Sequence, residues 1–130
     1  MDDLNIRNYA HIGDAVYEVF IREKVIYLTA NSNKLHSYTV KFVNAGFQKE
    51  LLEKITEFLT EDEKDLVRRG RNIPTSAARR INKSLHSYAT ALEVLLGYHY
   101  VHKKERYVEL LNIIEKTVDF SAIVRGEHSV

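Results

Sequence analysis

Two carboxylates stand out because each lies in a segment of mostly apolar or small residues. Asp14 belongs to YAHIGDAVYEVFIR at residues 9–22, and Glu93 belongs to YATALEVLLGYHY at residues 88–100. An unpaired buried carboxylate is costly in free energy, so such an acid is expected to have a partner or to bind a metal. A hard divalent cation such as Mg²⁺ suits two carboxylates whose remaining ligands are waters and phosphate oxygens. Asp14 and Glu93 are therefore candidate ligands of such an ion.

Glycines beside the two acids indicate how their helices could pack. A glycine inside a helix costs about 1 kcal/mol relative to alanine, so Gly13 and Gly97 suggest that another backbone or a ligand comes close. If the two segments cross there, Asp14 and Glu93 face each other and need a cation or a shared proton. Glu18, one turn after Asp14, could join the site through a water. The alternative is that the acids pair with arginine or tyrosine or reach solvent, with Glu18 an ordinary exposed residue.

Positive charge is concentrated between residues 68 and 83. This stretch holds six basic residues and no acid; without it, the 19 basic residues of the chain fall to 13, against 18 acids. Arginine side chains and backbone amides in an irregular loop can hold phosphates, the sequence-independent part of nucleic-acid binding. The candidate contact residues are Arg68, Arg69, Arg71, Asn72, Arg79, Arg80 and Lys83. The alternative is a solvated surface without a ligand.

The composition is typical of a helical globular domain. The 130 residues are 45% hydrophobic and 28% charged, with one proline and five glycines, which favours helices over strands. We expect one all-α domain over residues 1–130, with a mobile tail at about 125–130. The chain has no cysteine, no signal-peptide pattern and no apolar run of roughly 20 residues, so a soluble, cytoplasmic protein without membrane contact is expected.

Other common chemistries lack their motifs in this sequence. The glycines form neither a P-loop nor GxGxxG, no serine lies in GxSxG, and the six histidines include no HExxH. We expect His99 and His102 to form a surface pair. The tyrosines follow helical spacing, which favours core packing over base stacking.

Helical spacing of apolar residues predicts six to seven helices in a bundle. The first is apolar nearly all round, so it should run through the centre of the fold. Gly46 is the expected break in the second helical region, Thr60 and Glu63 form a predicted capping box, and Pro74 disfavours helix at Ile73. The predicted helical ranges are 5–28, 34–59 as one helix or two, about 60–70, a segment after residue 75 or 76, 84–101 and 104–118.

Three ordered motifs resemble the ribonuclease III family. IGDAV at 12–16 resembles the signature helix of its catalytic domains, and LEVLLG at 92–97 resembles their second acidic motif. The longer strings YAHIGDAVYE at 9–18, VRRGRN at 67–72 and YATALEVLLGY at 88–98 are similar to Mini-ribonuclease III, the bacterial branch that has the catalytic domain alone. Together they extend over most of the chain.

The resemblance implies an all-helical homodimer whose two active sites line a groove for double-stranded RNA. Each site would cut one strand using Mg²⁺, for which Mn²⁺ could substitute. By matching position, Asp14 and Glu93 would be the catalytic, metal-binding acids, and residues 68–72 with the following loop would lie beside the RNA. The expected role is maturation of ribosomal RNA precursors, with a ribosomal protein as a potential helper.

The chain departs from full-length ribonuclease III at three acidic positions. Two signature acids correspond by spacing to Arg7 and Ala10, and the acid three residues before the second glutamate corresponds to Thr90. Fewer protein ligands are therefore expected at the metal. The competing hypotheses are a non-catalytic helical module that binds structured RNA in ribosome assembly, and a helical protein-interaction adaptor.

Overall fold

The computed structural model describes residues 4–74 and 83–126, and the regular structure of these residues is entirely helical. The helices are α1 (Ile6–Val25), α2 (Ser32–Val43), α3 (Ala45–Ile55), the 3₁₀-helix η1 (Thr56–Phe58), α4 (Glu61–Arg71), α5 (Lys83–His102), α6 (Lys104–Thr117) and α7 (Phe120–Val124). The predicted all-α bundle is confirmed. The helical segment expected after residue 75 and the end of the tail, 127–130, lie outside the described residues.

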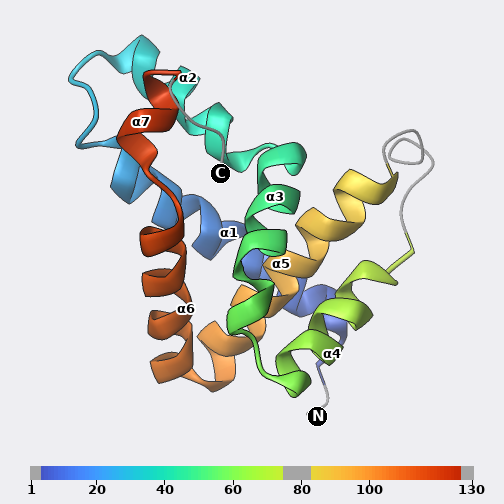
Figure 1. Ribbon diagram of the computed structural model, residues 1–130. Helices are drawn as coiled ribbons and strands as arrows, with labels where there is room; N and C mark the ends of the chain where they lie inside the picture. The colour runs from blue at the N-terminus through green and yellow to red at the C-terminus, as the bar shows by residue number, and fades with distance from the viewer. Residues whose placement is uncertain (1–3, 75–82, 127–130) are drawn as a thin grey trace.

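Helix α5 occupies the centre of the bundle. It contacts α1, α3, α4 and α6, and its buried side chains are mostly small or aliphatic. In Figure 1, α5 runs behind α3 and in front of α1, with α4 and α6 to either side. The central place predicted for the first helix is therefore taken by α5. Helix α1 instead exposes a face that includes Asp14, Ala15 and Val19, so the expectation of a helix buried all round is wrong.

The break between α2 and α3 falls at Asn44 rather than at Gly46. The Asn44 side chain accepts a hydrogen bond from the Phe47 amide at 2.9 Å and donates to the carbonyls of Val40 and Lys41, both at 3.0 Å. One asparagine therefore ends one helix and caps the next, because its side chain replaces backbone partners at both ends. Gly46 lies within α3.

Other helix boundaries follow local capping chemistry. The predicted capping box at the start of α4 is confirmed, with Thr60 and Glu63 bonded reciprocally at 2.9 and 3.1 Å. Helix α7 was not predicted; Asp119 caps it by accepting from the Ala122 amide at 3.0 Å. The ring of Phe120 packs edge-on against Phe42 of α2, with centroids 5.0 Å apart. None of the described helices combines the length and apolar character needed to cross a membrane.

Candidate active site

Helices α1 and α5 cross with their backbones in contact. A β-carbon placed on Gly13 would lie 2.9 Å from the Cα of Glu93 and nearer still to its carbonyl oxygen. One placed on Gly97 would lie 2.9 Å from the amide nitrogen of Gly13 and nearer still to the carbonyl oxygen of Tyr9. Only glycine fits at either position. The close approach predicted at Gly13 and Gly97 is confirmed, and it places the residue before Asp14 against the main chain of Glu93.

The carboxylate of Asp14 lies on the exposed face of α1. Within residues 4–74 and 83–126, no hydrogen bond or ion pair engages it. The expectation of a buried acid is therefore wrong, because Gly13, Tyr17 and the other buried residues of α1 form its covered face and Asp14 lies outside that face. An exposed carboxylate can still bind a hydrated cation that is shared with a phosphate. Asp14 stays a candidate ligand on the strength of its position beside the helix crossing.

Glu93 is half-buried on the other side of the crossing, and a buried tyrosine lies near it. Tyr17, only 1% exposed, donates a hydrogen bond from its hydroxyl to the Phe42 carbonyl at 2.5 Å. Burial raises the pKa of Tyr17, and the charge of Glu93 raises it further. Tyr17 therefore stays neutral and adds no negative charge at the crossing.

Glu18 is already engaged by a basic neighbour. Its carboxylate accepts from Nη2 of Arg22 at 2.7 Å and from Nε of Arg22 at 3.1 Å. A carboxylate with this partner is a weaker candidate for the water-mediated contact suggested by its spacing. That contact stays a prediction.

The donors at the crossing suit a hydrated Mg²⁺ rather than an ion enclosed by protein. In the described part of the chain, no group of three or more histidine or acidic side chains gathers where it could hold a metal. Mg²⁺ is commonly bound through one or two carboxylates, with waters and substrate phosphates completing the octahedron. Asp14 and Glu93 could supply such a pair, and a third acid is absent from the positions occupied by Arg7, Ala10 and Thr90.

Three arginines of the basic stretch, Arg68, Arg69 and Arg71, lie in the last turn of α4 and not in an irregular loop. Gly70 is buried within this turn, where α4 packs closely on α5. A β-carbon on Gly70 would lie 2.9 Å from the Cα of Ala91 in α5. The helix therefore continues past Gly70, and its basic side chains diverge around it. Arg69 lines a hollow next to α5, whereas Arg68 and Arg71 line a separate hollow next to α3.

The remaining candidate phosphate contacts have distinct surroundings. Arg68 pairs with Asp65 at 2.5 Å, and both side chains are more than half exposed. Asn72 is exposed at the end of α4, where its backbone N–H donates to backbone carbonyls of the last turn. Lys83 is exposed at the first residue of α5. Arg79 and Arg80 lie outside the described residues.

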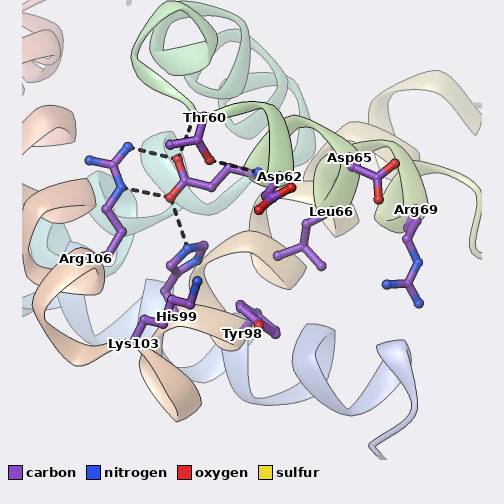
Figure 2. A pocket seen from close by; sticks show the side chains of 10 residues that line it. Thr60, Asp62, Asp65, Leu66, Arg69, Tyr98, His99, Lys103 and Arg106 are labelled. Atoms are coloured by element: carbon purple, nitrogen blue, oxygen red, sulfur yellow. Dashed lines mark hydrogen bonds and ion pairs between the residues drawn. The ribbon is translucent and has the colours of Figure 1, made fainter. Parts of the chain in front are cut away.

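A buried ionic network, which sequence reasoning missed, joins α4, α5 and α6. Glu63, 5% exposed, accepts from Nε and Nη2 of Arg106 at 2.8 and 2.9 Å, and Nε2 of His99 lies 3.1 Å from it. Figure 2 shows Arg106 and His99 directed at this one carboxylate, with Arg69 at the far end of the same hollow of about 580 Å³. His99 is 2% exposed, so the expected surface pair with His102 is wrong.

The charges of this network are set by burial and hydrogen bonding. Burial would raise the pKa of Glu63, but the hydrogen bonds from Arg106 and from the Thr60 amide outweigh it and lower the pKa to about 2. Burial lowers the pKa of His99 and outweighs the opposing effects of the Leu95 carbonyl and Glu63. At neutral pH the network therefore combines an ionised carboxylate, a cationic guanidinium and a buried imidazole that resists protonation. We interpret this network as structural.

Comparison with known proteins identifies the family. The family model described as the ribonuclease III domain matches residues 7–104, which include the α1–α5 crossing and both acids. The chain belongs to the ribonuclease III family. A ribonuclease III relative from Thermoanaerobacter sp., named Mini-ribonuclease 3, is 41% identical over 114 residues, covering 84% of this chain and 77% of the relative. A Synechocystis protein of the same name is 41% identical over 106 residues, covering 82% and 74%.

A solved structure supports the same family fold. The crystal structure of a Fusobacterium nucleatum protein aligns with a TM-score of 0.75 at 33% identity, covering 88% of this chain and 93% of that one. Membership of the ribonuclease III family, together with relatives named Mini-ribonuclease 3, supports an endoribonuclease activity. The predicted resemblance is therefore confirmed at the level of the family and of the Mini-ribonuclease III branch.

Proposed function

We propose that this endoribonuclease hydrolyses phosphodiester bonds of double-stranded RNA at the α1–α5 crossing with the assistance of Mg²⁺, for which Mn²⁺ could substitute. The observation that carries the proposal is the contact between the Gly13 backbone and the Glu93 main chain, which brings the helices of the two matching acidic motifs together. Processing of ribosomal RNA precursors in the cytoplasm is the proposed role.

Asp14 and Glu93 are proposed to bind the ion from opposite sides of the crossing. When bound, Mg²⁺ polarises a phosphoryl oxygen and lowers the pKa of the attacking water. The exposed Asp14 leaves room for waters and a substrate phosphate, while the half-buried Glu93 is restrained by its helix. No side-chain nucleophile is required.

Phosphate contacts are assigned to the basic residues at the ends of α4 and α5. Arg68, Arg69, Arg71, Asn72 and Lys83, with Arg79 and Arg80 between them, are proposed to hold the duplex through its backbone. Double-stranded RNA is recognised mainly by its A-form shape, phosphates and 2′-hydroxyls, because its deep major groove is closed to side chains. Contacts of this kind require no base-specific residues.

A homodimer is proposed from the family, and the second half of α1 with the two residues that follow it exposes apolar groups. Val19 and Ile26 are 57% and 56% exposed, and Tyr27 is 86% exposed. Exposed apolar groups mark a surface that another protein covers when they form a contiguous patch, and we propose that these residues belong to such a patch. Light scattering after gel filtration should give twice the monomer mass, and a monomer mass at micromolar concentration would contradict this part of the proposal. A ribosomal protein as helper remains a separate proposal, tested by its effect on cleavage.

The decisive experiment is cleavage of an end-labelled RNA duplex with Mg²⁺ or with EDTA. Wild-type protein should cut only with Mg²⁺ and leave 5′-phosphate and 3′-hydroxyl ends. Asp14→Asn and Glu93→Gln should each abolish cleavage while retaining the helical circular dichroism spectrum and RNA binding. Glu50→Gln, at an exposed acid of α3, is the matched control and should cut normally. Full activity of either site variant would refute the assignment, and binding without cleavage by wild type would favour the non-catalytic RNA-binding module.

A further inference from the structure

Two cations from different helices lie over one tyrosine ring. The Nζ atom of Lys49 in α3 is 5.1 Å from the centroid of Tyr88, and the Cζ atom of Arg71 in α4 is 4.1 Å from the same centroid. Tyr88 belongs to α5 and is half-buried. An aromatic face attracts a cation, so the ring holds each of these two side chains in place. Tyr88 therefore fixes a pair of positive charges where three helices meet.

No carboxylate neutralises this pair within the described part of the chain. Neither Lys49 nor Arg71 forms an ion pair there, although other cations do, including Arg68 with Asp65 and Arg22 with Glu18. A negatively charged ligand would be attracted to each of these side chains. Both cations are therefore available to bind anionic groups.

A hollow of about 410 Å³ lies beside the ring. Its apolar lining comes from Leu52 of α3, Leu59 between η1 and α4, and Val67 of α4. Its charged lining residues are Lys64, Arg68, Arg71 and Glu53. Glu53, one turn beyond Lys49, is the acid among them, and it forms no ion pair with either cation in the described residues. Three of the four charged lining residues are cationic, and two of them, Arg68 and Arg71, belong to the proposed RNA-contacting stretch.

We propose that Lys49 and Arg71, each held in place by the ring of Tyr88, bind backbone phosphates of the RNA duplex. The contact surface then extends from the end of α4 onto α3 and includes a residue, Lys49, far from the basic stretch in sequence. Tyr88 acts as a positioning residue, because its ring holds the two cations rather than a base. This inference rests on the proposed function, since the phosphates belong to the same substrate.

The test is the salt dependence of duplex binding, measured by fluorescence anisotropy in EDTA so that no cleavage occurs. Lys49→Gln should weaken binding of two duplexes of unrelated sequence by the same factor and reduce the slope of log K against log salt by about one. Lys54→Gln removes an equal charge from an exposed position of the same helix and should retain the wild-type slope. Equal slopes for the two variants would overturn the inference while leaving the proposed function intact.

Variants of the ring and of Glu53 separate positioning from simple charge. Tyr88→Phe retains the aromatic face and should bind as wild type, whereas Tyr88→Leu should reduce the slope as Lys49→Gln does. Glu53→Gln should bind the duplex more tightly, because it removes the negative charge beside the phosphate. A wild-type slope for Tyr88→Leu, or unchanged affinity for Glu53→Gln, would contradict the site. Failure of wild-type protein to bind any duplex would refute the proposed function and this site together.

Discussion

The main chain of Glu93 lies directly against Gly13, so the backbone of one candidate acid contacts the residue that precedes the other. This contact sets the separation of α1 and α5 at the site. It depends on the absence of side chains at Gly13 and Gly97 and not on any contact between the two carboxylates. The backbone positions of the two acids are therefore fixed by packing before an ion binds.

Replacing Gly13 by alanine should separate the two helices and destabilise the fold. Overpacking a rigid contact costs typically about 1–3 kcal/mol, and here the added methyl would meet backbone atoms, which cannot rotate away. Gly46→Ala is the control, because its β-carbon would meet only the Asn44 side chain at 3.3 Å. Urea unfolding should show a large loss for Gly13→Ala and little change or a gain for Gly46→Ala. Equal midpoints for the two variants would contradict the backbone contact.

Removing Arg106 should destabilise the protein because the buried carboxylate of Glu63 loses its ionic partner. Arg106→Ala strips Glu63 of two hydrogen bonds in a buried position, and breaking a buried ion pair in this way costs about 3–5 kcal/mol. Arg22→Ala breaks an exposed pair with Glu18 and should cost about 1 kcal/mol or less. Thermal and urea unfolding of both variants measure the difference. Similar losses would show that the network contributes no more than a surface pair.

Stability should fall in two steps as the pH is lowered. The pKa of His99 is below its ordinary value of 6.5 in the folded protein, so the unfolded chain binds this proton more readily and stability decreases below about pH 6.5. The pKa of Glu63 is about 2 against an ordinary 4.5, so a further loss occurs between those values. Urea unfolding from pH 7 to pH 3 gives the profile. His99→Gln should remove the upper step, and an unchanged profile in that variant would assign it elsewhere.

Neutralising the arginines at the end of α4 should weaken RNA binding through phosphate contacts. The double variant Arg69→Gln and Arg71→Gln should reduce the salt slope by about two, since each phosphate contact contributes about one. Lys54→Gln with Lys116→Gln removes the same charge at exposed positions elsewhere and serves as the control. A slope equal to that of the control would show that Arg69 and Arg71 do not touch phosphate.

Local chemistry made much of the fold predictable. The capping box at Thr60 and Glu63 lies within four consecutive residues, so the sequence predicts it directly. Gly13 and Gly97 lack side chains within helical segments, which correctly predicts a close approach of two helices. The break between α2 and α3 was predicted at Gly46 and lies at Asn44. Sequence spacing does not distinguish a break at a glycine from one at an asparagine that caps two helices. Helix α7 is short and depends on the contact of Phe120 with Phe42, which is distant in sequence.

The candidate site is less predictable from the sequence than the fold, because it depends on which face of each helix is covered. Apolar residues around Asp14 suggested burial, but the covered face of α1 is set by α5, and Asp14 lies outside that face. The partners of Glu63 are 36 and 43 residues away, so no motif predicted them. The identity of the two acids as a pair came from the family resemblance, with the glycines as the independent physical signal.

The position of α5 in the chain has a consequence for synthesis on the ribosome. Helices α1, α3 and α4 all pack on α5, yet all precede it in sequence, so they emerge before their common partner. During translation their apolar faces remain uncovered until the segment through His102 leaves the exit tunnel. Nascent chains halted before that point should therefore be sensitive to protease and bind chaperones, whereas chains released after it can close the core.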